Sequence, residues 1–334
     1  MAKFILANVL RHKTAENRTA TNALWLLDLA VIASVIGAFR LLPLPWASAA
    51  GARLGRGLGR VLKNRTRHVR ANLGLALPDR SAEEIADLAG EVWANAGAVL
   101  AEFPHLARFR DPQGDRVEIA MDEQVLACRD AGQQMIFVAA HIANWEVVAA
   151  TITRLGIPNC AMYAPLSNPW LDRRLRDYRR ALGCGLISRD AGLRGFFKAF
   201  ESGHSLSILT DRRIEGGKEI PFFGETKATS TLPARLALRL GAPLVPVQAQ
   251  RLPGARFRVS FHAPLRPGDP AAGQGDQAID LTRQINGKFE EWIADRPGEW
   301  VCTSKIWSSS VFRARKALHD GQGNTAGILE KHDV

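Results

Sequence analysis

A histidine and a glutamate stand five positions apart directly after a short uncharged run. The run is MIFVAA at residues 135–140; His141 follows it and Glu146 completes an H-x4-E motif. We expect the run to be a buried strand and a helix to begin near Asn144, so that the Glu146 carboxylate can turn back towards the imidazole. A carboxylate on one ring nitrogen fixes the tautomer and leaves the other nitrogen free to take a proton. The pattern predicts His141 as a general base and Glu146 as its orienting acid.

Other residue types limit the chemistry. The sequence has no G-x-S-x-G nucleophile elbow, so the proton is expected to come from a substrate hydroxyl, with direct acyl transfer. The four cysteines form no CxxC pair and no cluster of histidines accompanies them, so we expect no metal, no cofactor and reduced thiols. The cysteines are Cys128, Cys160, Cys184 and Cys302.

The elements around His141 follow an alternating pattern. Strands are expected at 116–120, 135–140, 160–164, 206–210, 243–251 and 257–263. Helices are expected at 145–155, 169–182, 193–201, 232–240 and 276–294, after a helix that begins with a capping box of Ser81 and Glu84. This alternation predicts an α/β fold with a largely parallel sheet flanked by helices. In such sheets functional loops lie at the carboxyl ends of strands, where His141 is expected.

The amino-terminal part has the character of a membrane-binding segment. Residues 23–39 are apolar apart from Asp28, and extending this run to Trp46 makes it long enough to span a bilayer. Of the net charge of +11, a segment at 29–78 without Asp or Glu carries +8. Within it, cations at 53, 56, 60, 63, 67 and 70 are spaced to form one stripe on a helix over 51–70, typical of a helix on an anionic membrane surface. A buried core helix and a solvated helix face are the alternative interpretations.

These features divide the chain into a cytoplasmic segment (1–22), a membrane anchor (23–46), a catalytic domain (47–310) and a flexible tail (311–334). The catalytic domain includes the basic helix over 51–70. Because basic residues flank the anchor on the side of the catalytic domain, the positive-inside rule places that domain in the cytoplasm.

Several ordered blocks cover nearly the whole chain. They are HIANWE at 141–146, RLGRGLGRVL at 53–62, YAPLSNPWLDRRLRDYRR at 163–180 and LTDRRIEGGKEIPFFGETKATSTLPARLALRLGAPLVPV at 209–247. Together they resemble the bacterial lipid A late acyltransferases and their mycobacterial phosphatidylinositol-mannoside relatives, and HIANWE is similar to that family's H-x4-D/E motif. The resemblance implies a glycerolipid-acyltransferase-like fold with an amino-terminal anchor helix.

The resemblance also implies roles for individual residues. His141 would be the general base, with Glu146 as its orienter. Arg179 matches an arginine important for activity, and Asp211 matches the family's second acidic residue. An arginine can hold a phosphate or a developing oxyanion, and an aspartate can fix that arginine's fork. A surface cation is the other interpretation of Arg179.

Neighbouring positions complete the candidate site and mark departures from the family. Asn144 and Arg212 are further candidates for contacts that support substrate, oxyanion or phosphate. Ala164 stands where the family has Arg, and Ser304 and Ile306 replace a His and an Arg of its carboxyl-terminal segment. These departures concern the identity of the acceptor and leave His141 unchanged.

The sequence thus predicts an inner-membrane acyltransferase acting at the cytoplasmic face. It would move a fatty acyl chain from acyl carrier protein, or from coenzyme A, to a hydroxyl of a lipid A precursor or related membrane glycolipid. Alternatives are a lysophospholipid, ornithine-lipid or phosphatidylinositol-mannoside type acyltransferase, or a non-catalytic lipid-binding protein. We expect no nucleic acid as a partner, because few aromatic residues lie near the basic segment to stack on bases.

Overall fold

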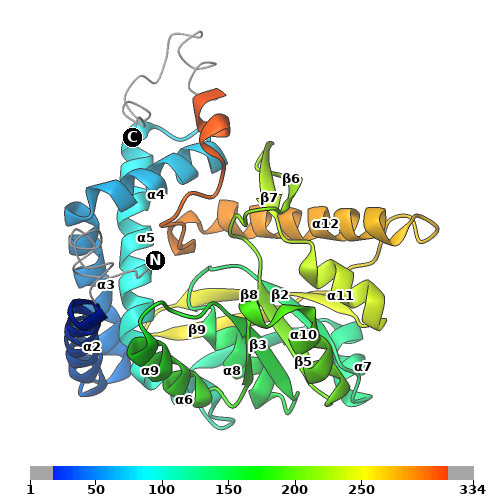
Figure 1. Ribbon diagram of the computed structural model, residues 1–334, viewed down its shortest axis with the longest axis horizontal. Helices are drawn as coiled ribbons and strands as arrows, with labels where there is room; N and C mark the ends of the chain where they lie inside the picture. The colour runs from blue at the N-terminus through cyan, green and yellow to red at the C-terminus, as the bar shows by residue number, and fades with distance from the viewer. Residues whose placement is uncertain (1–17, 315–334) are drawn as a thin grey trace.

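The computed structural model describes residues 18–314, which are built around one seven-stranded sheet with helices on both faces (Figure 1). The strands of this sheet are β1 (Val117–Met121), β2 (Ile136–Ala139), β3 (Asn159–Tyr163), β4 (Gly185–Ser188), β5 (Ser205–Leu209), β8 (Leu244–Leu252) and β9 (Arg256–Phe261). Their order is β1-β9-β8-β2-β5-β3-β4, and every neighbouring pair is parallel except β8 and β9. The predicted α/β class with a largely parallel sheet is confirmed.

The helices form an amino-terminal group and a group around the sheet (Figure 1). The first group is α2 (Arg18–Arg40), α3 (Leu44–Val61), α4 (Lys63–Ala76) and α5 (Ala82–Glu102). The second is α6 (Ala107–Arg110), α7 (Glu123–Asp130), α8 (Glu146–Arg154), α9 (Pro169–Arg180), α10 (Gly192–Glu201), α11 (Leu232–Leu240) and α12 (Gln274–Asp295), with short 3-10 turns η2 (Phe103–His105), η3 (Arg189–Ala191) and η4 (Pro297–Glu299). The connections from β2 to β3 and from β4 to β5 run in opposite directions along the sheet, so right-handed crossovers place α8 and α10 on opposite faces.

The sequence patterns missed three strands. β4 is short and contains glycine, and a separate antiparallel hairpin of β6 (Lys218–Phe222) and β7 (Glu225–Thr229) carries Pro221 and mostly polar residues. Neither segment has the run of apolar residues that identified the buried strand β2, all of whose residues are buried. The capping box predicted for α5 is confirmed: Ser81 Oγ accepts from Glu84 N, and the Glu84 carboxylate accepts from Ser81 N.

Glycines on one face of α3 allow it to pack closely against α5. Gly51, Gly55 and Gly59 recur every four residues, and a Cβ built on Gly55 would lie 2.2 Å from the carbonyl oxygen of Trp93. A side chain at these positions would force the two helices apart, so glycine is required by close approach here despite its low helix propensity.

The basic segment is two helices instead of one. α3 ends at Val61 and α4 begins at Lys63, with Leu62 between them at φ −82° and ψ 59°. Because this break changes the helix direction, the cations at 53, 56, 60, 63, 67 and 70 do not form the single continuous stripe that their spacing predicted. All six side chains are exposed.

Helix α2 carries the apolar amino-terminal run. Among residues 18–314 it is the one helix long and apolar enough, by length and composition, to cross a bilayer. Several of its large apolar side chains are exposed, namely Leu26, Leu27, Val31 and Val35, whereas Asp28 is buried. Residues 1–17 of the expected segment 1–22 lie outside the described residues. Residues 315–334 of the expected tail 311–334 also lie outside them.

Candidate active site

His141 and Asp211 meet at the carboxyl edge of the sheet. β2 and β5 are neighbouring parallel strands in which Ala139 pairs with Leu209, and each of the two polar residues stands two positions beyond this pair. Nδ1 of His141 lies 2.6 Å from Oδ1 of Asp211. The other ring nitrogen, Nε2, forms no hydrogen bond with any residue of the described range 18–314, and the side chain is 14% exposed. The imidazole is therefore held on one side and free to receive a proton on the other.

The Asp211 carboxylate is fully buried and bound from a second side. The indole Nε1 of Trp300 donates to its Oδ2 at 3.0 Å. Burial alone would raise the pKa of Asp211, but the facing His141 ring, the nearby Arg212 and the indole hydrogen bond outweigh it and hold that pKa well below its usual range. Asp211 is thus an ionised carboxylate that fixes the His141 ring.

Lys227, on β7, is a buried cation behind Asp211. Its side chain is 1% exposed, its Nζ donates to the backbone oxygen of Asp211 at 2.9 Å, and it lies 3.7 Å from the centre of the Phe222 ring. Burial lowers its pKa to about 7, although the carboxylates of Asp211 and Glu290 oppose this shift. Lys227 supports the backbone at the site and titrates near neutral pH.

Glu146 is not the partner of His141, contrary to the pairing expected from the sequence. Its carboxylate instead binds Arg179 on α9, whose Nε lies 3.1 Å from both carboxylate oxygens and whose Nη2 lies 2.6 Å from Oε1. Burial works against the charge of Arg179, but the Glu146 carboxylate outweighs it and raises the pKa of the guanidinium. The arginine fork is likewise fixed by Glu146 and not by Asp211. This ion pair joins α8 to α9 beside the dyad of His141 and Asp211.

The backbone between the histidine and the glutamate is held in a strained turn. Ala143 is buried and has φ 50°, a region that costs a residue with a Cβ of order 1 kcal/mol and persists where surrounding contacts determine it. Those contacts come from the segment after α12: Val301 N donates to the oxygen of His141 at 2.8 Å, and Ala143 N donates to the oxygen of Glu299 at 3.0 Å. Asn95 of α5 donates to both Ala143 and Glu299.

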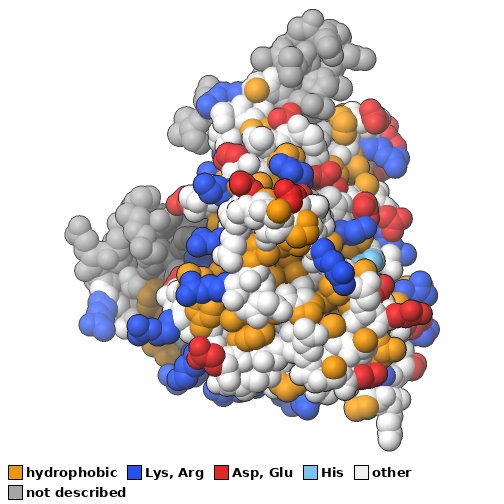
Figure 2. Space-filling view, turned by 90° about the vertical axis from the view of Figure 1, so that its right-hand side faces the viewer, with side chains coloured by type: hydrophobic (Ala, Val, Ile, Leu, Met, Phe, Trp, Pro, Cys, Tyr) orange, Lys and Arg blue, Asp and Glu red, His pale blue; other side chains and the backbone are white. Residues whose placement is uncertain are grey.

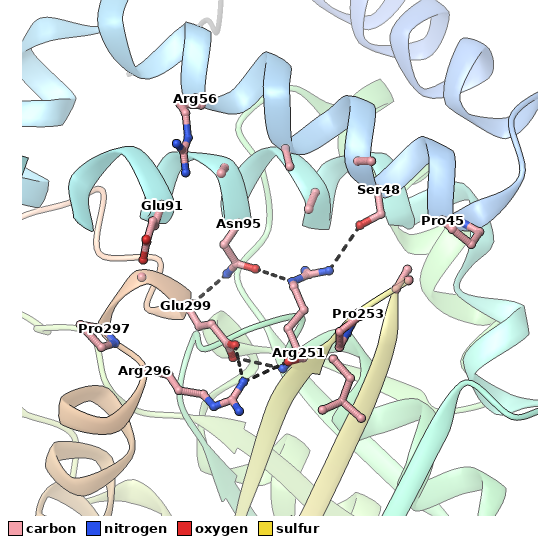
Figure 3. Close-up of a pocket in the computed structure, with 18 of the residues that line it drawn as sticks. Pro45, Ser48, Arg56, Glu91, Asn95, Arg251, Pro253, Arg296, Pro297 and Glu299 are labelled. Atoms are coloured by element: carbon pink, nitrogen blue, oxygen red, sulfur yellow. Dashed lines mark hydrogen bonds and ion pairs between the residues drawn. The ribbon is translucent and has the colours of Figure 1, made fainter. Parts of the chain in front are cut away.

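A buried polar network under this turn ties it to the amino-terminal helices. Asn144 is fully buried; its Nδ2 donates to Oε2 of Glu102, and its Oδ1 accepts from Glu146 N. Arg251 of β8 forms an ion pair with Glu102 and donates to Asn95. Figure 3 shows Arg251 and Asn95 at one wall of a pocket of about 540 Å³ between α3, α5 and the β8–β9 turn. Asn144 therefore points into the protein, where it positions the turn.

The remaining candidate positions lie around this core. Arg212 is exposed next to Asp211, and Ala164 is exposed after β3. Ile306 is buried, and its backbone N donates to Asn72, which also donates to the backbone oxygen of Ser304. Ser304 and Ile306 thus belong to a segment held against α4.

An apolar cavity opens beside the dyad, between the sheet and helices α8 and α9. Its volume is about 60 Å³, and Trp145 and the Glu146–Arg179 ion pair form part of its wall. Trp145 links the cavity to the imidazole, because its ring lines the cavity and its ring centre lies 4.9 Å from that of His141. The rest of the lining is mainly apolar and includes Phe137, Val148, Ala161, Met162, Leu186 and Ile208. This cavity suits hydrocarbon next to the group that would take a proton.

Trp300 and Lys227 were not predicted as site residues from the sequence. No pattern in EWVCTSKIW at 299–307 marks Trp300 as a partner of Asp211, which lies 89 positions away. A lysine in a hairpin normally points to solvent. One feature of the sequence could have identified Asp211 as the partner of His141: both residues directly follow an expected strand.

Known proteins similar to this chain are acyltransferases of bacterial lipids. Residues 14–309 match the family described as bacterial lipid A biosynthesis acyltransferase. The lipid A biosynthesis myristoyltransferase of Escherichia coli is 27% identical over 269 residues, 79% of this chain and 80% of the relative. Lipid A biosynthesis acyltransferase 1 of Shigella flexneri is 26% identical over the same shares, and the phosphatidylinositol mannoside acyltransferase of Mycolicibacterium smegmatis is 23% identical over 61% of this chain and 66% of that relative.

The family match and the relatives define the class of the protein as an acyltransferase. The chain belongs to the bacterial lipid A biosynthesis acyltransferase family. The resemblance found in the sequence blocks is confirmed.

Proposed function

We propose that the protein transfers a fatty acyl chain from an acyl thioester to a hydroxyl of a lipid A precursor or a related glycolipid, with His141 as general base. The single observation that carries this proposal is the 2.6 Å contact between His141 Nδ1 and the ionised Asp211, which leaves Nε2 free. That arrangement suits a base that takes the proton of an attacking hydroxyl, and the apolar cavity lined by Trp145 suits the hydrocarbon of the thioester that the hydroxyl attacks.

In the proposed reaction Nε2 of His141 removes the proton of the acceptor hydroxyl as its oxygen bonds to the thioester carbonyl carbon. The C=O electron pair moves onto the carbonyl oxygen, then re-forms the double bond as the C–S bond breaks. The leaving thiolate takes the proton from the imidazolium, which returns His141 to its starting state. Asp211 stabilises the positive ring between these two proton transfers.

The cations near the dyad have separate proposed roles. Arg212 is exposed next to Asp211 and is placed to hold a phosphate of the acceptor or the developing oxyanion. Two nitrogens of Arg179 already bind the Glu146 carboxylate. Arg179 therefore supports the cavity wall through Glu146. Asn144 acts on the turn and not on the substrate.

The relatives support a glycolipid acceptor, since some are named for lipid A and others for phosphatidylinositol mannoside. We assign the donor as acyl carrier protein, with coenzyme A as the alternative thioester. The second candidate function is acylation of a lysophospholipid or an aminolipid. It is favoured by Ala164, Ser304 and Ile306, which stand where resemblance to the family leads one to expect charged or polar side chains.

We place the protein at the cytoplasmic face of the inner membrane, with α2 inserted and α3 on the surface. With its glycine face against α5, the outer part of α3 divides into an apolar stripe and a cationic stripe. The apolar stripe is Trp46, Leu54, Leu58 and Val61, all at least 48% exposed; the cations are Arg53, Arg56 and Arg60. A helix of this kind inserts apolar side chains between lipids while its arginines contact anionic headgroups.

Product analysis tests the proposal. The purified protein would be mixed with acyl carrier protein loaded with chains of different length and with a bacterial lipid extract, and the lipids analysed by mass spectrometry. We expect a lipid A-type species to gain the mass of one acyl group, and His141→Ala to give no such product. A gain on a lysophospholipid or aminolipid supports the second candidate instead, and equal product from folded His141→Ala would contradict the general-base role.

A further inference from the structure

A groove lies on the side of the molecule away from α2. It runs between α10, α11 and the first turn of α12 and has a volume of about 530 Å³. Figure 2 looks onto this side and shows apolar side chains gathered in a hollow that basic side chains border. The apolar lining is Leu193, Phe197, Leu236, Leu238, Ala278 and Ile279. Leu193, at the rim, is 44% exposed.

The cations that line the groove have no acidic partners. Lys218, Arg235 and Arg239 are exposed, and none of the three forms an ion pair within residues 18–314. Arg239 lies over the ring of Phe197, 4.8 Å from its centre, so that its charge stays at the groove. The groove carries a single acidic side chain, Asp276, against these three cations. Its surface is therefore apolar at the floor and positive at the rim.

Two cations on the sheet are neutralised locally. Arg256 and Arg258 on β9 both pair with Glu118 of β1. The three groove cations form no such ion pair within residues 18–314, and a positive rim around an apolar floor complements an acidic amphipathic surface.

The position of the groove decides between a lipid and a soluble partner. In Figure 1, α2 and α3 lie at one side of the molecule, and α10, α11 and the start of α12 lie at the other. With α2 and α3 at a bilayer, the groove faces the aqueous phase, where a lipid headgroup does not reach it.

We propose that this groove docks the acidic surface of the acyl carrier protein that delivers the thioester; the inference rests on the proposed function. The hairpin links the groove to the dyad: Lys218 begins β6, and Phe222, about 13 Å further along the strand, packs on Trp300 with 6.1 Å between ring centres. Since Trp300 binds Asp211, a carrier in the groove has only to extend its flexible arm across the sheet edge to reach His141.

The test compares two donors that carry the same acyl group: acyl carrier protein and the small thioester acyl-pantetheine. The full-length variant Arg235→Glu/Arg239→Glu should raise KM for the carrier donor about 10-fold or more while kcat stays within about 2-fold, because reversed rim charges weaken encounter and not chemistry. Turnover of acyl-pantetheine should stay within about 2-fold of the unmodified protein. The control Arg258→Glu/Arg266→Glu changes the net charge equally at exposed residues outside the groove and should leave both donors unaffected.

Two results would overturn the docking site: an unchanged KM for the carrier in Arg235→Glu/Arg239→Glu, or an equal rise in KM in the control. Should that variant fail to fold, Arg235→Gln/Arg239→Gln replaces it, with the same ordering of effects expected at smaller size. The proposed function fails separately, if the unmodified protein transfers acyl groups from neither donor or His141→Ala transfers them equally well.

Discussion

Nδ1 of His141 lies 2.6 Å from Oδ1 of Asp211, although 70 positions separate the two residues in the sequence. The contact arises because β2 and β5 are parallel neighbours with Ala139 opposite Leu209, so the residues two positions beyond each strand meet at one edge. Such an edge is where α/β sheets build their sites. Asp211 is in turn fixed by Trp300 and by the backbone contact from Lys227.

The indole hydrogen bond to Asp211 should contribute to catalysis. Trp300→Phe keeps an aromatic ring but removes the donor to a buried carboxylate, and a hydrogen bond to a charged group contributes about 1.5–3 kcal/mol. We expect kcat to fall by about 10-fold or more with little change in KM. Trp307→Phe is the matched control, since Trp307 is equally buried but its indole nitrogen has no hydrogen-bond partner among the described residues. Equal loss in both variants would assign the effect to packing.

Lys227 should make stability depend on pH in a defined direction. Burial lowers its pKa to about 7 from 10.5, so between these values the unfolded chain binds more protons than the folded one. The free energy of unfolding therefore gains a contribution that grows as pH rises from about 7, on the order of 3 kcal/mol by about pH 9.5. Lys227→Met should lack this contribution, whereas Lys218→Met at an exposed position of the same hairpin should retain it. Urea unfolding of all three proteins at several pH values measures this contribution. If the free energies of unfolding of the unmodified protein and Lys227→Met differ by the same amount at every pH, the prediction is wrong.

Because α3 packs against α5 on one face only, alanine substitutions at Gly55 and Gly57 of α3 should change the stability in opposite directions. Gly55→Ala places a Cβ about 2.2 Å from the backbone oxygen of Trp93, so we expect a loss of about 1–3 kcal/mol from overpacking. A Cβ on Gly57 meets nothing within 4 Å, so Gly57→Ala should gain roughly 0.5–1 kcal/mol from helix propensity alone. Thermal unfolding measures both. The interpretation fails if the two substitutions shift Tm in the same direction.

The cavity beside His141 should influence acyl chain length. Leu186 lines it, and Leu186→Ala removes an isopropyl group from the wall. Because the cavity measures only about 60 Å³, we expect the preference to shift towards longer donors, seen as a higher kcat/KM for longer relative to shorter chains. Leu193→Ala, at the distant groove, is the control. An unchanged preference in Leu186→Ala would place the acyl chain elsewhere.

Local patterns predicted the parts of the fold that depend on neighbouring residues. The buried run before His141 and the capping box of Ser81 are both present, because strand burial and helix capping act over a few positions. The break at Leu62 was missed, and so was the glycine face of α3, which depends on how α5 packs against that helix.

The candidate site shows the same limit. The residue types expected from the sequence are present at the sheet edge, but the partners of Glu146 and Asp211 were exchanged. A carboxylate one helical turn away is the nearest candidate in the sequence, whereas the actual partner of His141 depends on strand order. That β5 lies next to β2, ahead of β3, is a property of the topology that spacing along the chain does not contain.

The assignment of Asp211 as the partner of His141 is tested most directly by comparing kcat of Asp211→Asn and Glu146→Gln, with folding of each checked by circular dichroism. Asparagine keeps the shape of the aspartate but removes the charge that supports the imidazolium, so we predict a fall of about 10³-fold or more. Glu146→Gln weakens the contact with Arg179 and should lower kcat far less. A folded Glu146→Gln protein that loses as much activity as Asp211→Asn, or an Asp211→Asn protein that remains active, would contradict the assignment.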